Sequence, residues 1–422
     1  MTMRILPGQK CNLLERGIVT VTSEHAQLGR TRLYDGRPSR AWRSASLAAD
    51  QTIRVDGNLL TDGVTDYGGF ESWSGGSPVG WTETPTGTGD VTQEGAIVNS
   101  GASSAKFTGG TGTAGCYRDV VVKAGEIITI ASALRGDGTA GMRLYVENRL
   151  THKYLVAGGG SWGAVQTFRN EIPAAWSATE VSGIVVEDFA ACQSDLVTLR
   201  LSLYLAAGGA TTYADDVRVW PRVNFGSIHG HNLDPGQVVT FRSSTDAWAA
   251  SDDAEATAVN TTPSFYTLLT AGNQDRRYWG FKLAGVPSVY PEIGELVIGY
   301  ARTPLQQFEN PLEESTRWDR QLSVTPGGER HVHKRSKWQI RNRVFLYTYY
   351  SQAEYDEGIE LFHLRPAGDT YPVVIVPDHD KPTVIHGRLE STFSDARDWT
   401  AGVIFNDVAV ALNESPFAST AY

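Results

Sequence analysis

Three groups of histidine and aspartate residues have a spacing that could support metal binding or acid–base chemistry. His229 and His231 form one pair, His331 and His333 form another, and "DHD" at 378–380 lies between two prolines. Residues two apart on a strand project from the same face, so each histidine pair could share a metal ion. Neither pair has nearby cysteines or carboxylates, and "PDHDKP" is typical of a solvated surface turn. We therefore expect all three groups to be structural.

Sequence motifs of familiar enzymes are absent from the chain. It contains no Gly-x-Ser-x-Gly elbow, no phosphate-binding glycine loop and no His-Glu-x-x-His. Carboxylate pairs for glycoside hydrolysis must lie roughly 5–10 Å apart in a cleft, which spacing along a sequence does not establish. The sequence therefore predicts that this protein is not an enzyme.

Aromatic side chains offer a different chemistry, because their rings stack on the apolar faces of sugar rings. Trp162 lies in the glycine-rich segment "AGGGSWGA", where few neighbours protect it. Tyr145 and Tyr204 lie in strand-like segments, and Tyr204 falls on the polar side of its alternation. We expect these three residues to contact carbohydrate. The alternative for Trp162 is packing against the protein core.

Short strands must position these residues. The 422 residues include 44 Gly, 11 Trp and 17 Tyr, which is typical of many short strands joined by glycine-rich turns. Apolar and polar residues alternate in the segments 125–136 and 196–205, as in half-buried strands. The length predicts two to four domains.

One helix is predicted, in the last third of the chain. Ser351 and Glu354 have the spacing of a capping box, and Tyr355, Ile359 and Phe362 continue an apolar stripe. Strand-like segments flank this helix, so residues 303–422 are predicted to form an α+β domain. For the whole chain we expect a mostly β fold, with β-sandwich or jelly-roll domains before the α+β domain.

Charge and cysteine content exclude several classes of protein. The formal net charge of −10 disfavours nucleic acid as a partner, and the most basic window, residues 330–343, is better explained as a strand edge or a subunit contact. Cys11, Cys116 and Cys192 are too scattered for a disulfide framework or a zinc site. No apolar run is long enough to span a membrane. The first residues lack the apolar region of a signal peptide, so we expect the chain to start inside a cell.

Two separated segments, 1–57 and 221–302, together resemble a discoidin-like (galactose-binding-like) β-sandwich. The resemblance rests on "LYDGRPSRAWRS", "TIRVD", "VNFGSIHGHNLDPGQVVTFRSS", "RRYWGFKL" and "YPEIGELVIG". Asp35 and Glu295 match positions where that family often holds calcium. Arg37 and Arg40 stand where an acidic residue and a hydroxyl are usual, and a guanidinium repels the ion. We therefore expect this sandwich to be metal-free, with Trp42 and Trp279 in its core.

The segment 58–220 resembles a second jelly roll, the carbohydrate-binding modules that accompany xylanases. The matching motifs are "NLLTDGVTDYGGFESWSGGSPVGW", "SGASSAKFTGG" and "TTYADDVRVW". That family often holds a structural calcium where its first and last strands meet, and Glu71 and Asp216 match those ligands. The alternative is that each carboxylate caps a turn. The resemblance places Trp81 and Trp220 in the core.

These resemblances imply that the jelly roll 58–220 is inserted into the first sandwich. The seam would lie at residues 56–57 and 220–222, so Val55 and Val223 are expected to lie close together. The ends of a compact domain are often close, which makes such an insertion easy to accommodate.

Residues 303–422 resemble the smaller domains of tail-tip proteins of tailed bacteriophages, in the order of their elements. The resemblance implies a virion structural protein of the tail, made in the host cytoplasm, that assembles with copies of itself and with other tail proteins. The inserted module would then touch a host surface glycan. An alternative is an accessory carbohydrate-binding protein of a bacterial polysaccharide-degrading system. In a third interpretation both sandwiches are only architectural.

Overall fold

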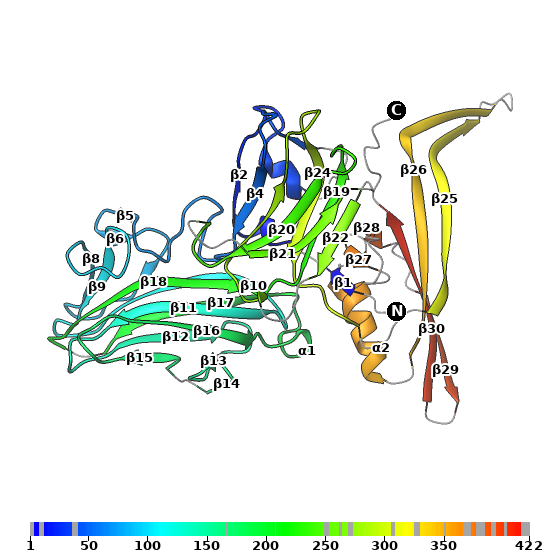
Figure 1. Cartoon of the computed structure of the whole chain (residues 1–422). Coiled ribbons are helices and arrows are strands. Elements are labelled where there is room, and N and C mark those ends of the chain that lie inside the picture. Colours follow the sequence, from blue (N-terminus) through cyan, green and yellow to red (C-terminus); the bar gives the residue numbers. More distant parts are fainter. Residues whose placement is uncertain are drawn as a thin grey trace.

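The protein is mostly β and contains several antiparallel sheets (Figure 1). The computed structural model describes residues 4–7, 12–35, 41–164, 167–206, 208–248, 253–260, 264–268, 273–304, 309–324, 330–349, 352–365, 373–376, 385–389, 394–400 and 403–414. Within these ranges, no helix is long and apolar enough to cross a membrane.

Strands from both ends of the segment 12–302 share two sheets. In the first sheet the order is β2-β4-β23-β20-β21. Strand β4, from the beginning of the chain, therefore lies between β2 and the much later strand β23. The second sheet has the order β22-β19-β24-β3. The strands are β2 (Ile18–Val21), β3 (Trp42–Arg43), β4 (Gln51–Asp56), β19 (Phe225–His231), β20 (Val238–Ser244), β21 (Asp253–Val259), β22 (Ser264–Leu268), β23 (Tyr278–Leu283) and β24 (Glu292–Gly299). The motifs "TIRVD", "VVTFRSS", "RRYWGFKL" and "YPEIGELVIG" therefore fall on β4, β20, β23 and β24.

Large aromatic side chains fill the interior of this first sandwich. Trp42 and Trp279 are 1% and 0% exposed, which confirms both as core residues. Phe241 stacks on Trp279 with ring centroids 5.5 Å apart. Burying rings of this size supplies much of the apolar area that stabilises the two sheets.

Residues 58–220 form two further sheets, and their buried apolar residues belong to the same core cluster as those of the first sandwich. One has the order β14-β13-β12-β17-β10-β7, with β15 also pairing β12, and the other has the order β16-β11-β18-β9-β8. A short hairpin, β5 (Trp73–Ser74) and β6 (Ser77–Pro78), precedes them. The strands are β7 (Thr82–Glu83), β8 (Asp90–Glu94), β9 (Ser104–Thr108), β10 (Ala114–Lys123), β11 (Ile127–Arg135), β12 (Met142–Asn148), β13 (Lys153–Leu155), β14 (Trp162–Gly163), β15 (Arg169–Glu171), β16 (Ser177–Val185), β17 (Leu196–Leu205) and β18 (Thr211–Pro221), with the short helix α1 (Phe189–Cys192) before β17.

The alternation predicted for residues 196–205 is confirmed by β17. Its buried residues alternate strictly with partly exposed ones. Trp81 and Trp220 are 7% and 4% exposed, as expected for core residues.

The two ends of the segment 58–220 lie side by side. The Leu59 N–H donates to the Val219 carbonyl at 2.7 Å, and the Gly57 N–H donates to the Arg277 backbone carbonyl at 2.9 Å. Val55 lies opposite Trp279 in the sheet, while the Val223 N–H donates to the Gln274 backbone carbonyl just before that strand. Both ends therefore lie against one short stretch of the first sandwich, as an inserted segment requires.

The remaining strands form a separate sheet with the order β1-β27-β28-β30-β26-β25, and β29 also pairs β30 (Figure 1). The predicted helix is present as α2, which continues into a π-helical turn, although Ser351 of the capping box lies outside the described residues. The prediction of an α+β domain stays a prediction. The elements are β25 (Glu309–Val324), β26 (Arg330–Tyr349), α2 (Gln352–Ile359), β27 (Val373–Val376), β28 (Ile385–Leu389), β29 (Ser394–Thr400) and β30 (Val403–Glu414).

The first strand departs from the expectation that residues 1–57 belong with the first sandwich. Strand β1 (Arg4–Pro7) pairs with β27 instead. Leu6 is buried in a small apolar cluster with Val374 and Val376 of β27 and with Phe225 and Val297 of the sandwich. This shared cluster links the N-terminal strand to both sheets.

Candidate functional site

The structure brings two of the predicted sugar-contacting residues together. Tyr145 on β12 and Tyr204 on β17 are both partly exposed, on neighbouring strands of one sheet. Their ring centroids are 6.4 Å apart and their planes are inclined at 74°. Cross-strand pairing puts Ser202 opposite Tyr145 and Arg143 opposite Tyr204, so all four residues share the face that points away from the core.

Tyr204 lies over a glycine of the neighbouring strand. Gly115 on β10 is directly opposite Tyr204, and a Cβ added to it would come within 3.1 Å of the tyrosine Cδ2 atom. A larger residue at 115 would therefore push the ring away from the sheet. Because residue 115 is a glycine, the Tyr204 ring can pack flat against the sheet, with its other face toward solvent.

A third tyrosine on the same face is covered. The Arg200 guanidinium lies 3.7 Å from the centroid of the Tyr117 ring and makes paired hydrogen bonds with Asp119, at 2.7 and 2.8 Å. Sequence reasoning missed this cluster, because only the strand register reveals that β10 and β17 place these residues side by side.

Arg143 is the available cation of this face. Arg200 pairs with Asp119, and Arg149 pairs with Glu147 at 2.8 Å. Arg143 is partly exposed, and among the described residues it has no hydrogen-bond or ion-pair partner. The exposed residue Asn170 lies opposite Arg143 on β15. Hydrogen-bond donors therefore lie beside the two free tyrosine rings. We call Tyr145, Tyr204, Arg143 and Asn170 the tyrosine face.

Trp162 lies on the other side of this sheet. It is paired with Leu155, which is fully buried, so the two side chains point toward the core. Its indole N–H donates to the Val185 carbonyl of the opposing sheet at 2.9 Å. The structure thus separates Trp162 from Tyr145 and Tyr204, and a ligand contact by this residue stays a prediction.

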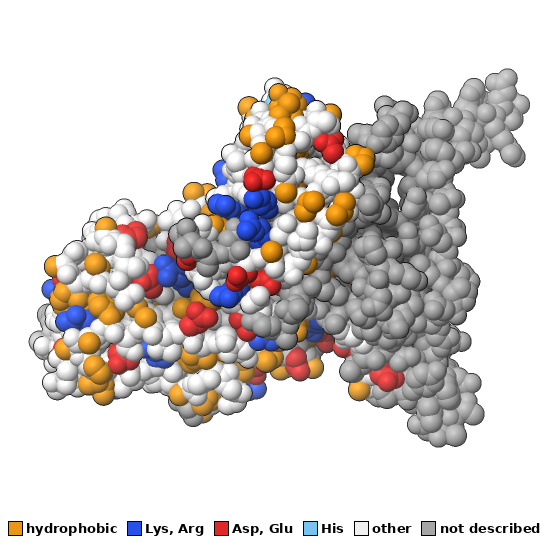
Figure 2. Space-filling view, viewed as in Figure 1, with side chains coloured by type: hydrophobic (Ala, Val, Ile, Leu, Met, Phe, Trp, Pro, Cys, Tyr) orange, Lys and Arg blue, Asp and Glu red, His pale blue; other side chains and the backbone are white. Residues whose placement is uncertain are grey.

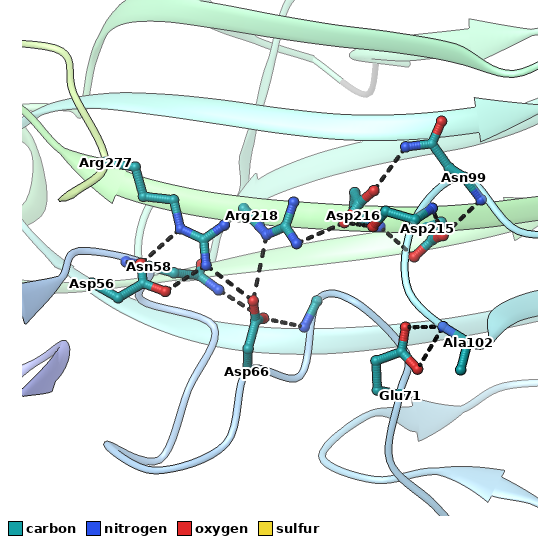
Figure 3. Close-up of polar contacts among 12 residues, drawn as sticks. Asp56, Asn58, Asp66, Glu71, Asn99, Ala102, Asp215, Asp216, Arg218 and Arg277 are labelled. Carbon is teal, nitrogen blue, oxygen red and sulfur yellow. Dashed lines mark hydrogen bonds and ion pairs between the residues drawn. The ribbon is translucent and has the colours of Figure 1, made fainter. Parts of the chain in front are cut away.

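The two carboxylates predicted to bind calcium are held by one loop (Figure 3). Both oxygens of Glu71 accept the Ala102 N–H, at 3.0 and 3.2 Å. Asp216 accepts from the Asn99 side-chain amide at 2.7 Å and from the Ser100 hydroxyl at 2.8 Å. Each carboxylate therefore caps backbone or side-chain donors of the loop 99–102, as the alternative interpretation proposed.

A guanidinium stands beside the predicted calcium ligand. Arg218 Nη2 lies 2.6 Å from Asp216 Oδ1, and a Cβ added to Gly69 would be 4.0 Å from the same nitrogen. Arg218 therefore puts a positive charge directly beside Asp216, one of the two predicted calcium ligands. Calcium needs six to eight oxygen ligands and no nearby cation. These residues, as arranged, do not fit the ion.

Arg218 belongs to a row of alternating charges that crosses the seam (Figure 3). Its Nε atom lies 3.4 Å from Asp66, which also lies 3.1 Å from Arg277. Arg277 makes paired hydrogen bonds with Asp56 at the end of β4. We call Asp56, Arg277, Asp66, Arg218 and Asp216 the charge ladder. It links the first sandwich to the inserted segment.

Asp215, next to the ladder, is fully buried. Burial, with a smaller effect from the neighbouring Asp216, raises its pKa to about 6. The N–H groups of Asn99 and Ser100 donate to its carboxylate at 3.0 and 3.1 Å, which partly offsets that effect. These bonds fix the loop on which Glu71 and Asp216 also depend.

The histidine and cysteine candidates look structural where they can be described. His229 is fully buried, and its Nε2 lies 2.7 Å from the Ser227 hydroxyl. Cys116 and Cys192 are buried free thiols, and burial raises the pKa of both. Among the described residues, no group of three or more His, Cys, Asp or Glu could hold a metal. The side chains of His331 and His333, and residues Cys11, Arg37, Arg40 and 378–380, lie outside the description.

No protein-family model and no curated protein matches the sequence. Solved structures match parts of it at low identity. The module TmCBM61 in complex with β-1,4-galactotriose has 16% identity and a TM-score of 0.26, covering 37% of this chain and 97% of its own. The CBM22-1 xylan-binding domain of Paenibacillus barcinonensis Xyn10C has 19% identity and a TM-score of 0.25, and the match covers 36% of this chain and 90% of that domain. The enzymatically active domain of tailspike protein 4 of bacteriophage CBA120 has 11% identity and a TM-score of 0.26, and the match covers 36% of this chain and 21% of the tailspike chain.

Proposed function

We propose that residues 58–220 form an inserted module that binds carbohydrate on the tyrosine face. The single observation that carries this proposal is the pair of partly exposed rings of Tyr145 and Tyr204, 6.4 Å apart beside the unpartnered Arg143. Tyrosine supplies apolar ring area with little loss of conformational entropy, and a guanidinium donates to sugar hydroxyls. Both rings stand on strands, so the sheet holds them in place before any ligand arrives.

The arrangement suits an extended ligand. The rings lie on neighbouring strands of a sheet face, with Arg143 on the same strand as Tyr145 and Asn170 on the next strand outward. A sugar ring stacked on Tyr204 would have Arg143 within reach of its hydroxyl groups. Because β12 and β17 run side by side, a chain of sugars could cross from one ring to the other.

We further propose that the whole protein is a structural protein of a phage tail tip, without enzymatic activity. The order of elements in residues 303–422 and the split sandwich support this proposal. In it, copies of the chain and other tail proteins assemble in the virion, and each copy presents its module to a host glycan. Weak binding at one module would become strong through several copies.

An accessory protein of a polysaccharide-degrading system is the second candidate function. The same tyrosine face supports it equally, because the face does not depend on residues outside 58–220. Electron microscopy of the purified chain separates the two. A closed ring supports the tail protein, whereas a monomer that promotes polysaccharide hydrolysis by a partner enzyme supports the accessory protein.

A glycan array with the full chain tests the carbohydrate proposal. We expect binding that Tyr145→Ala and Tyr204→Ala each weaken about ten-fold or more, the effect of removing a ring at the centre of a contact. Tyr290→Ala is the matched control, because this tyrosine is 40% exposed but lies on the first sandwich. If no glycan binds, or if all three variants bind like the parent, the tyrosine face is not a carbohydrate site and the architectural interpretation is favoured.

A further inference from the structure

A second pair of aromatic rings lies on the other sheet of the jelly roll, away from the tyrosine face. Trp176 directly precedes β16, and Tyr213 lies on β18. Both side chains are partly exposed, their ring centroids are 6.4 Å apart and their planes are inclined at 58°. The outer surfaces of two packed sheets point in opposite directions, so this pair and the tyrosine face lie on opposite sides of the jelly roll.

Strand register puts an arginine between the two rings. Arg135 on β11 lies directly opposite Tyr213, and its guanidinium is 5.7 Å from the centroid of that ring. The two chain neighbours of Tyr213 are fully buried, so its own side chain points away from the core. The pairing of β11 with β16 ends at Leu134 and Ser177, one residue before Arg135 and one after Trp176. We call Trp176, Arg135 and Tyr213 the tryptophan face.

The polar groups of the tryptophan face have no partners in the part of the chain that the structure describes. Within that part the Arg135 side chain makes no hydrogen bond and no ion pair, and its Nε atom is buried without an acceptor. Its contact with the Tyr213 ring is close to the outer limit of about 6 Å for a cation and a ring. The Trp176 indole N–H and the Tyr213 hydroxyl also lack a hydrogen-bond partner among the described residues. An incoming acceptor would therefore recover free energy that these groups lose on leaving water.

An exposed apolar loop leads into this surface. Residues 172–175, with the sequence Ile-Pro-Ala-Ala, are all exposed, and Ile172 is 43% exposed. The loop is fixed by its backbone, because the N–H groups of Gly136 and Gly138 donate to the carbonyls of Pro173 and Ile172, each at 2.9 Å. Four consecutive exposed apolar residues are uncommon away from a contact surface. Figure 2 shows hydrophobic side chains beside Lys and Arg at the end of the jelly roll farthest from the first sandwich, which is the end where β18 begins.

We propose that the tryptophan face is a second carbohydrate site, which binds a sugar unit independently of the tyrosine face. The two aromatic rings pack on the apolar surface of a sugar ring, while the guanidinium and the indole N–H donate to its hydroxyl or carboxylate oxygens. Neighbouring strands fix the rings before a ligand arrives. With one site on each outer surface, a single jelly roll holds two sugar chains at once. The two sites share no residue, so this one does not rest on the proposed function of the tyrosine face.

A glycan array with neutral and acidic sugars, probed with the full chain, tests the proposal. The double variant Tyr145→Ala and Tyr204→Ala removes the tyrosine face, and we expect it to keep binding glycans. Adding Trp176→Ala should weaken that remaining binding about ten-fold or more, the effect of removing a ring at the centre of a contact. Adding Val185→Ala instead is the matched control, because this residue is 56% exposed at the other end of β16. The proposal is overturned if the double variant binds no glycan, or if Trp176→Ala and Val185→Ala have equal effects.

A second variant keeps both rings, so it tests the site even where Trp176→Ala perturbs folding. Arg135→Gln, added to the same double variant, should weaken glycan binding about ten-fold, because the charged donor is lost. A loss confined to acidic glycans identifies a sugar carboxylate as the acceptor, and an equal loss on neutral glycans identifies hydroxyl oxygens. Unchanged binding on both contradicts the site.

Light scattering tests the other possible occupant of this surface, a second copy of the chain. We expect the parent protein and Trp176→Ala to have the same oligomeric state. If Trp176→Ala dissociates an oligomer and keeps its glycan binding, the surface is an interface between copies and the sugar site is wrong.

Discussion

The charge ladder predicts that Arg218, rather than a calcium ion, holds the first segment of the jelly roll against its last strand. Replacing Arg218 with methionine keeps most of the side-chain length but removes the positive charge next to Asp216 and Asp66. We expect the parent protein to unfold at the same temperature in excess EDTA and in excess calcium. The Arg218→Met variant should unfold at a lower temperature in EDTA and recover part of the loss in calcium, because Asp216 then faces no guanidinium.

The size of the effect follows from the contacts that are lost. Arg218 approaches Asp216 at 2.6 Å and Asp66 at 3.4 Å, and the three side chains are 11–25% exposed. A hydrogen bond between charged groups is worth about 1.5–3 kcal/mol, and partial exposure lowers this. Asp216 keeps its bonds to Asn99 and Ser100. We therefore expect a loss of about 1–2 kcal/mol, or roughly 2–8 °C in Tm for a unit of this size.

Differential scanning calorimetry with and without EDTA measures both effects. Arg276→Met is the control, because it breaks a more exposed pair with Asp253 at 3.2 Å, which should cost less than about 1 kcal/mol. The reasoning is refuted if EDTA lowers the Tm of the parent protein by several degrees. It is also refuted if Arg218→Met unfolds like the parent under both conditions.

Three further predictions concern the seam and the inserted segment. Arg16→Met removes the partner of buried Glu126, whose pKa burial raises and Arg16 lowers, to a net value below normal. In the parent protein the ionised form of Glu126 is the stabilising one. Chemical denaturation should therefore show that Arg16→Met lowers the free energy of unfolding by about 3–5 kcal/mol near pH 8. The decrease should be smaller near pH 5, where protonation of Glu126 removes the unpaired buried charge. Gly68→Ala should cost about 2–4 kcal/mol in urea unfolding, since its Cβ would fall 1.6 Å from a carbonyl oxygen of β18, whereas Gly160→Ala, with open space around it, should be neutral. Trp162→Ala should lower the Tm, because the indole packs against the core. Weaker glycan binding by the same variant would support the predicted ligand contact, and an unchanged affinity would remove Trp162 from the site.

Sequence alternation predicted the buried face of β17 but was wrong for residues 125–136, where β11 has runs of three consecutive buried residues. The alternation of residues 196–205 placed Tyr204 on the outer face of β17, and the structure confirms that placement. The pattern works because side chains alternate across a strand and only one side meets the core. The glycine-rich context of Trp162 did not show on which side of the sheet this residue lies, since composition indicates how a loop bends but not which face its side chains cover.

Contacts between residues that are far apart in the chain could not be predicted from the sequence. The sequence placed Arg218 one residue after a valine in a closing strand, with no sign that it meets Asp66, 152 positions away. In the same way, Arg277 and Asp56 look unrelated until β23 pairs with β4. Each of these clusters depends on strand register, which pairing between distant segments decides.

The sequence by itself determined that this is a mostly β protein, that its apolar residues alternate to bury one face of each sheet, and that a second set of strands begins after Gly57. Only the tertiary structure decided that Tyr145 and Tyr204 lie together, that Trp162 lies on the other side of their sheet, and that Arg218 lies beside Asp216. The physical reason is that burial patterns are local to a strand, whereas charge and ring contacts depend on which strands become neighbours.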